Sequence, residues 1–462
     1  KKINEKKSKL TKFAKIKYFL KSSVSKNNNE RLIKKVFEKL NNSKRPILLV
    51  GSGCVIDGVN QKKIEELITQ IQVPIANSWG SLELIEDNNK FYVGAPGTVG
   101  KRTANIIIKN SDFILAIGNR IDLATTAYAP EKFGEQVKDF FVVDIDKGEL
   151  KFHKKLGRKT INSGAKKFIN DFLIHIKKNK TALEISNLQR KEWIEFCNTI
   201  KNKYSSRSYT KYISEVATKE GWSTYDVVED LSNLLDKNKY IVTGSSGHGV
   251  EVFYSYFRVK SNQRVFHSPG LGSMGFALGS AIGIALSDNL KKESRVTLIE
   301  TDGSFNTNPQ ELGIIANLNL KIDIYIFNNN GYLSIRNGQN KSFGGRLSGV
   351  NEKSGLGCAN LKLLCESYGI KYAKANNNDE LKQIINSNSN QTIERPTLTE
   401  LMISKSEELL PKCMPQKDEK GNITSMPIED MTPLLKLNEL EEIMKYKELS
   451  SESIKIRKRL IK

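Results

Sequence analysis

The sequence predicts an α/β protein with two doubly wound parallel-sheet domains. In two blocks of the chain, short apolar runs typical of buried strands alternate with amphipathic stretches typical of helices. Polar turns that contain glycine follow several of the apolar runs, as expected at the carboxyl ends of strands in such sheets. The length of 462 residues suits two or three domains of ordinary size.

The first block starts with the helical pattern ERLIKKVFEKL and the strand PILLV, which ends in a glycine turn. Further strands are expected in QVPIANS, DFILAIGN and DFFVVDID, with a helix in VGKRTANIIIKN. The turn Gly51-Ser52-Gly53 lacks the third glycine of a dinucleotide-binding loop. We therefore interpret it as a packing turn.

The second block starts with YDVVEDLSNLL and continues through the expected strands KYIVTG, RVFHS, RVTLIE, KIDIYIF, IKYAKA and PTLTELMIS. After it the pattern weakens, and MPIEDMTPLL is expected to lie over the surface before a charged helix closes the chain. The expected division is a basic linker at 1–29, a first α/β domain at 30–180, a helical connection at 181–222, a second α/β domain at 223–405 and a tail at 406–462.

The composition favours a cytoplasmic protein without a nucleic-acid or membrane partner. The net charge is +22, but the basic residues are spread over a chain that is rich in Lys, Asn and Ile throughout. A basic nucleic-acid binder remains an alternative that salt-dependent binding would separate. Five scattered cysteines suit a reducing cytosol, and four histidines are too dispersed for a zinc cluster. The longest small-apolar run, 273–286, is too short to span a bilayer.

The most informative stretch is TDGSFNTNPQELGIIANLNLKIDIYIFNNNGY, which begins at Thr301. Asp302 follows the strand RVTLIE and Asn329 follows the strand IDIYIF. Between them we expect a helix with an N-cap at Asn308, a proline in its first position and a capping-box acid three residues after the cap. Such a β-α-β unit returns the chain beside its first strand, so Asp302 and Asn329 should meet at the carboxyl edge of the sheet.

The chemistry of these two side chains suits a magnesium-bridged diphosphate. Carboxylate and carboxamide oxygens are hard ligands for Mg²⁺ or Ca²⁺, and Mg²⁺ fills its remaining positions with water and substrate phosphates. The N–H groups of Gly303 and Ser304 lie near a helix start and are expected to donate to phosphate. The alternative is that Asp-Gly and Asn-Asn-Gly are only turn formers.

At this point the stretch resembles the motif of thiamine-diphosphate-dependent enzymes, which reads G-D-G, a helix-length gap, and N-N. The matching residues are Asp302, Gly303, Asn328 and Asn329. Thr301 stands where the motif has its first glycine. The resemblance implies that Asp302, Asn329 and the carbonyl of Gly331 hold Mg²⁺, which in turn holds thiamine diphosphate.

Two further segments resemble the same family. PGLGSMGFALGSAIGIA, residues 269–285, is similar to the family's G-x-M-G turn and helix, which implies contacts of Gly272 and Met274 with the aminopyrimidine of the cofactor. The loop in VTGSSGHG is similar to one that touches the diphosphate. The residues expected to make that contact are Ser246, Gly247 and His248. For this loop an ordinary strand-to-helix turn is the alternative.

The same glycines also allow a dinucleotide reading. Gly270, Gly272 and Gly275 form a G-x-G-x-x-G pattern, which is the fingerprint of an NAD-binding oxidoreductase. That alternative needs an acid at the end of the next strand. Asp288 is near the required distance but precedes that strand, which weighs against it.

Over residues 30–440 the chain resembles acetolactate-synthase-like enzymes, especially those found with surface-sugar biosynthesis. The resemblance implies decarboxylation of a 2-oxo acid followed by carboligation, in a homo-oligomer. It also implies a middle domain that binds FAD in some members and nothing in others.

In this family a pyrimidine-binding domain supplies the catalytic glutamate, and residues 1–29 cannot form it. We therefore assign no catalytic residue within this chain and expect that glutamate from an absent N-terminal segment, another copy or another chain. The fragment alone is expected to be inactive. A non-catalytic or regulatory subunit that keeps the fold is the alternative.

Overall fold

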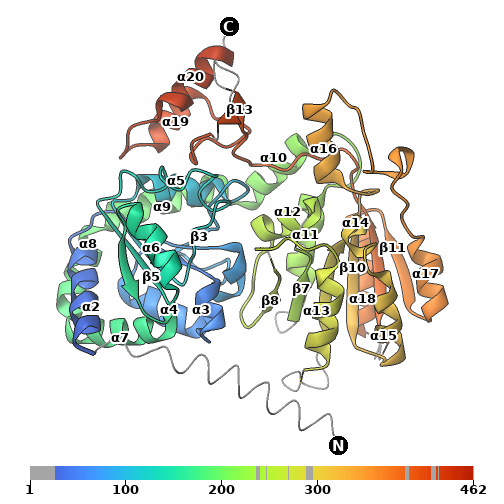
Figure 1. Cartoon of the computed structure of the whole chain (residues 1–462), viewed down its shortest axis with the longest axis horizontal. Coiled ribbons are helices and arrows are strands. Elements are labelled where there is room, and N and C mark those ends of the chain that lie inside the picture. Colours follow the sequence, from blue (N-terminus) through green and yellow to red (C-terminus); the bar gives the residue numbers. More distant parts are fainter. Residues whose placement is uncertain are drawn as a thin grey trace, which may run out of the picture.

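The computed structural model describes residues 26–235, 240–245, 247–268, 270–287, 295–390, 395–417, 423–424 and 426–460. It shows two α/β domains side by side, with the C-terminal helices lying over the first of them (Figure 1). The predicted linker, residues 1–29, falls outside the described residues as far as residue 25, and within the described part of the chain the first helix, α2, begins at Lys26. Across the described part of the chain, no helix combines the length and the apolar composition that a membrane span requires.

The first domain is a six-stranded parallel sheet covered by helices on both faces, as predicted. Its strands are β1 (Pro46–Val50), β2 (Ile75–Asn77), β3 (Tyr92–Gly94), β4 (Phe113–Ile117), β5 (Asp139–Asp144) and β6 (Lys159–Asn162), in the order β3-β2-β1-β4-β5-β6. Its helices are α2 (Lys26–Asn41), α3 (Ser52–Ile56), α4 (Gln61–Ile71), α5 (Arg102–Asn110), α6 (Lys147–Lys155) and α7 (Ala165–Lys178), with a 3₁₀ turn at Trp79–Leu84.

Both faces of this sheet are buried, which explains its continuous apolar strands. In β1, Leu48 and Val50 belong to one core cluster and Ile47 and Leu49 to the other. The turn after β1 packs closely, because a Cβ on Gly51 would lie 2.3 Å from the carbonyl oxygen of Gly118. This close approach supports the interpretation of Gly51-Ser52-Gly53 as a packing turn.

The second domain is also a six-stranded parallel sheet. Its strands are β7 (Tyr240–Thr243), β8 (Arg264–Phe266), β9 (Val296–Thr301), β10 (Ile322–Asn328), β11 (Lys371–Ala375) and β12 (Thr397–Met402), in the order β11-β12-β10-β9-β7-β8. Its helices are α11 (Thr224–Leu234), α12 (His248–Tyr256), α13 (Phe276–Ala285), α14 (Asp302–Phe305), α15 (Leu312–Asn317), α16 (Leu333–Ser342), α17 (Leu361–Tyr368) and α18 (Asn378–Asn390). The strand order reverses between β7 and β9, which makes their carboxyl ends a topological switch point.

In the helical connection α8 (Lys180–Gln189) and α9 (Lys191–Tyr204) pack against the first domain and α10 (Arg207–Ala217) packs against α11 of the second, whereas the later part of the tail packs against the first domain. The tail contains β13 (Gln416–Lys417), β14 (Ile423–Thr424), α19 (Leu437–Ile443) and α20 (Ser451–Leu460). Met431 is fully buried, and its carbonyl accepts a 3.0 Å hydrogen bond from the guanidinium of Arg102. The expectation that this part of the tail lies over the surface is therefore wrong, because it completes a core.

Candidate functional site

Asp302 and Asn329 lie at the ends of neighbouring strands. β9 and β10 run parallel, with Thr301 opposite Phe327. Asp302 is the first residue of α14, directly after β9, and Asn329 directly follows β10. The two residues therefore sit at the same carboxyl edge of the sheet, as the sequence predicted.

Each of these residues keeps one buried oxygen without a partner. The side chain of Asp302 is 6% exposed, and its Oδ2 accepts a 2.7 Å hydrogen bond from the N–H of Gly331. Among the described residues, neither Asp302 Oδ1 nor Asn329 Oδ1 has a hydrogen-bond partner. Buried polar atoms in proteins are almost always paired. A carboxylate oxygen and a carboxamide oxygen left unpaired at one edge form a donor set that fits a hard divalent cation.

Burial makes the Asp302 carboxyl a weak acid. It raises the pKa of this group from 3.8 to about 6, although three neighbouring backbone N–H groups and the guanidinium of Arg336 lower it. In the metal-free protein, burial thus disfavours the ionised form of the Asp302 carboxyl. A cation at the free oxygen would favour that charged form.

The loop after β10 has a backbone that few residues other than glycine adopt. Asn328 Oδ1 accepts a 2.9 Å hydrogen bond from the N–H of Asn330. Asn330 has φ +64° and Gly331 has φ +115°. A Cβ on Gly331 would lie 2.3 Å from the carbonyl oxygen of Val350. This crowding fixes the course of the chain beside Asp302.

The turn after β9 is equally crowded. A Cβ on Gly303 would lie 2.5 Å from the ring of Tyr332, so this ring lies against the turn. A side chain at Gly303 therefore has no room, and the backbone of the turn packs directly against this ring.

The loop after β7 borders the same switch point. Gly247 has φ +105° and precedes the first residue of α12, and a Cβ there would lie 3.0 Å from Thr301 Oγ1. Ser246, the first of the three residues predicted in this loop, lies outside the described residues. The nine-residue helix α12 therefore begins beside the turn that follows β9, and the positive end of its dipole favours negative charge there.

His248 does not have the exposed side chain that a direct phosphate contact requires. Its ring is 1% exposed, and its Nε2 shares a 2.7 Å hydrogen bond with a carboxylate oxygen of Glu407. Glu407 also accepts hydrogen bonds from the hydroxyls of Thr218 and Ser223. The side chain of His248 thus anchors the start of α12 to the interior of the domain.

The second predicted segment is tied to the first by two hydrogen bonds. Gly272 has φ +62° and Gly275 has φ +77°, and Met274 between them is 47% exposed. The N–H of Gly275 donates to Ser304 Oγ at 2.9 Å, and its carbonyl accepts from the carboxamide of Asn308 at 2.9 Å. The turn that carries Gly272 and Met274 is therefore held against the turn that carries Asp302.

These bonds correct the predicted helix cap. The side chain of Asn308 makes no capping hydrogen bond, because its carboxamide is directed to Gly275 instead. The chain after it forms a 3₁₀ turn at Pro309–Glu311 before α15 begins at Leu312. The sequence has the residues of a helix cap, but Asn308 makes the tertiary hydrogen bond to Gly275 instead of the capping bond.

Two buried ionisable residues beside the site were missed by sequence reasoning. Glu300 is fully buried, accepts a 2.9 Å hydrogen bond from the N–H of Thr301, and has its pKa raised to about 7 by burial. Arg336 is 7% exposed and donates to the loop after β10. An acid at the end of the apolar run RVTLIE was the one available signal for Glu300, whereas nothing in the sequence indicated Arg336.

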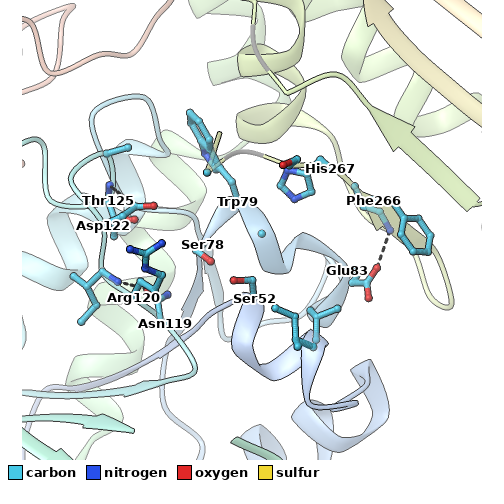
Figure 2. A pocket seen from close by; sticks show the side chains of 18 of the residues that line it. Ser52, Ser78, Trp79, Glu83, Asn119, Arg120, Asp122, Thr125, Phe266 and His267 are labelled. Atoms are coloured by element: carbon cyan, nitrogen blue, oxygen red, sulfur yellow. Dashed lines mark hydrogen bonds between the residues drawn. The ribbon is translucent and has the colours of Figure 1, made fainter. Parts of the chain in front are cut away.

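A cavity of about 470 Å³ lies between the two domains. Figure 2 shows Ser52, Ser78 and Asn119, at the ends of β1, β2 and β4, facing Trp79 and His267. The wall from the second domain includes Gly270 and Phe276, which flank the turn described above. Burial lowers the pKa of His267 to about 4, so its ring is neutral at physiological pH.

Comparison with known proteins assigns both domains. Residues 33–172 match the family model "Thiamine pyrophosphate enzyme, central domain", and residues 246–400 match "Thiamine pyrophosphate enzyme, C-terminal TPP binding domain". The chain is 29% identical over 365 residues to a probable acetolactate synthase large subunit of Methanococcus aeolicus, covering 77% of this chain and 58% of that protein.

Two other relatives give the same picture. Over 394 residues the chain is 27% identical to an acetolactate synthase large subunit of Cyanidium caldarium, covering 84% of this chain and 62% of the relative. Over 429 residues it is 27% identical to a probable acetolactate synthase large subunit of Methanocaldococcus jannaschii, covering 91% and 67%. The chain thus spans 58% and 62% of the length of the first two relatives.

Proposed function

Because this chain belongs to the thiamine pyrophosphate enzyme family, of which it carries the central and the C-terminal, cofactor-binding domains, we propose that it binds thiamine diphosphate through Mg²⁺. The proposed metal ligands are Asp302 Oδ1, Asn329 Oδ1 and the carbonyl of Gly331. The observation that supports this most strongly is the pair of unpartnered, buried oxygens at the edge between β9 and β10. Mg²⁺ binds through few carboxylates and completes its shell with water and phosphate, so this donor set fits it.

The diphosphate is proposed to lie over the switch point between β7 and β9. There the N–H groups at the start of α12, beside Gly247, and those of Gly303 and Ser304 can donate to its oxygens. The dinucleotide alternative has no comparable support, because the C-terminal match assigns this domain to thiamine pyrophosphate.

Gly272 and Met274 are proposed to contact the aminopyrimidine. Their turn is fixed to the turn of Asp302 by the side chains of Ser304 and Asn308. Leu271 is 86% exposed and Met274 is 47% exposed, which leaves apolar surface beside the site for the cofactor and for a covering domain. The same hydrogen bonds would keep the turn that contacts the aminopyrimidine in place relative to the metal ligands.

The proposed reaction is decarboxylation of a 2-oxo acid and carboligation of the remaining fragment, as expected from acetolactate synthase relatives. When bound, thiamine diphosphate would supply a nucleophilic carbon that attacks the 2-oxo acid and a ring that accepts the electrons released on decarboxylation. The residues of this chain bind the diphosphate, orient the aminopyrimidine and keep the metal loop rigid. By the family resemblance, the glutamate that protonates the aminopyrimidine comes from a pyrimidine-binding domain, and neither matched domain supplies it. No step is assigned to FAD or to the interdomain cavity.

Residues 1–462 alone, given thiamine diphosphate and Mg²⁺, are expected to consume pyruvate no faster than buffer does. Without the glutamate at the aminopyrimidine the cofactor is held but not activated. A polypeptide that also contains a pyrimidine-binding domain of the same protein should form oligomers and turn over pyruvate at about 1 s⁻¹ or faster, as ordinary enzymes do. A coupled assay for pyruvate consumption measures both.

The same assay separates the alternatives. Enzymatic turnover by residues 1–462 alone would contradict the proposal that a pyrimidine-binding domain supplies the catalytic glutamate. Cofactor binding without turnover in the longer polypeptide would favour a non-catalytic subunit.

Metal binding should depend on the protonation of Asp302. The pKa of this group is about 6 in the metal-free protein, so protons compete with the cation below that pH. We expect the apparent affinity for Mn²⁺ to be flat above about pH 7 and to fall about tenfold for each pH unit below 6. The stability of the metal-free protein should depend on pH in the opposite direction to the metal affinity. Because the pKa of Asp302 is raised on folding, the group favours the folded state at low pH, and that contribution is lost as the pH rises through about 6.

Electron paramagnetic resonance of free Mn²⁺ measures this affinity without diphosphate, whose own titration would otherwise interfere. An affinity that does not change between about pH 5 and about pH 8 would show that the ion is bound elsewhere.

A further inference from the structure

Arg336, in α16, is a buried cation that donates three hydrogen bonds to backbone carbonyls. Its Nη1 donates to the carbonyl of Asn330 at 3.1 Å, and its Nη2 donates to those of Asn329 at 2.9 Å and Lys405 at 2.8 Å. Its side chain is 7% exposed. No ion pair of Arg336 with a carboxylate occurs among the described residues. Burying a guanidinium without a carboxylate ion pair is energetically unfavourable. A functional role for Arg336 would explain why a buried charge is present here.

These hydrogen bonds fix the peptide units that carry the proposed metal ligands. The carbonyls of Asn329 and Asn330 belong to the two peptide groups that lead into Gly331. Holding both carbonyls sets the direction of the Asn329 side chain and of the backbone at Gly331, where φ is +115°. Lys405 lies in the segment after β12, which is the neighbour of β10 in the sheet. The guanidinium therefore also connects the loop after β10 to the segment after β12.

The charge of Arg336 also acts on the metal edge. Asp302 and Arg336 attract each other, and the attraction raises the pKa of the guanidinium against the lowering effect of burial. The guanidinium and the proposed Mg²⁺ together carry three positive charges, which exceed the single negative charge of the Asp302 carboxylate. A diphosphate at the same edge would supply the missing negative charge.

We propose that Arg336 is a positioning residue for the metal and diphosphate: it holds residues 329–331 in their ligating conformation, and its fixed charge favours a bound polyanion. This inference rests on the proposed function. It differs from a purely structural role, in which Arg336 would stabilise the fold without a specific effect on metal affinity. Residues that orient metal ligands typically contribute 10–100-fold to metal affinity.

The test compares three variants by Mn²⁺ titration with millimolar thiamine diphosphate, followed by electron paramagnetic resonance, and by thermal melting without ligand. Arg336→Gln should bind Mn²⁺ with thiamine diphosphate about 10–100-fold more weakly than the wild type. Arg336→Lys keeps the charge but loses the planar fork, so about a tenfold loss is expected. Arg395→Gln is the matched control, because Arg395 is an exposed arginine just before β12, and it should bind as the wild type does.

Each outcome decides the question. If Arg336→Gln folds and binds Mn²⁺ with thiamine diphosphate as tightly as the wild type, the role of Arg336 is overturned but the proposed function is not. If Arg336→Gln does not fold, Arg336→Lys decides: a loss of about tenfold supports the inference, and unchanged affinity overturns it. A wild type that binds no Mn²⁺ in the presence of thiamine diphosphate overturns the proposed function and this inference with it.

Discussion

Replacing Asp302 with alanine is expected to abolish the Mg²⁺-dependent part of thiamine diphosphate binding. The substitution removes the carboxylate proposed as a metal ligand and leaves Asn329 as the only proposed side-chain ligand. A divalent ion then loses its charged protein ligand, and the loss should exceed about 100-fold in affinity. Isothermal titration of thiamine diphosphate with and without Mg²⁺ measures this loss.

Two further variants make this result specific. Asp302→Asn keeps the shape of the side chain and removes its charge, and it should lose nearly as much affinity as the alanine variant. Asp379→Ala is the matched control, because Asp379 is 90% exposed in the first turn of α18, which follows β11 and not β9 or β10. Asp302→Ala that binds the Mg²⁺ complex as the wild type does would refute the assignment of this carboxylate.

Replacing Gly331 with alanine is expected to destabilise the protein by about 2–5 kcal/mol and to remove metal-dependent binding. The residue has φ +115°, and the added Cβ would lie 2.3 Å from a backbone carbonyl oxygen that cannot move freely. Relief of that clash must displace the N–H that Gly331 donates to Asp302 and the carbonyl proposed as a metal ligand. Chemical denaturation and metal titration measure the two effects.

Gly355→Ala separates the cost of positive φ from the cost of the steric clash at Gly331. Gly355 has φ +97°, but a Cβ there would meet nothing within 4 Å. This variant carries the penalty of the unusual backbone alone, about 1–2 kcal/mol, and should keep its metal affinity. Equal destabilisation of the two variants would show that the contact with Val350 does not fix the metal loop.

The main features of the fold and of the site edge followed from local patterns that tertiary contacts reinforce. Apolar runs such as PILLV are buried on both faces of a parallel sheet, so their composition identifies them directly. Asp302 and Asn329 are brought together by strand pairing, and the β-α-β pattern predicts that pairing from sequence alone.

The features that sequence reasoning missed depend on long-range contacts. Asn308 is a good helix cap by composition, but its carboxamide bonds to Gly275, which is 33 residues away along the chain. His248 follows a glycine loop, as a phosphate ligand would, yet Glu407 engages its ring from 159 residues away. Arg336 has no local signal, because its partners are backbone carbonyls that any sequence provides.

The most direct test of the account is a crystal structure with Mn²⁺ and thiamine diphosphate, in which anomalous scattering locates the metal. The expected result is one Mn²⁺ at the carboxyl edge between β9 and β10, coordinated by Asp302, Asn329 and the carbonyl of Gly331 and by the diphosphate. A metal at any other position, or a diphosphate lying in the interdomain cavity with Asp302 Oδ1 still unpaired, would contradict it.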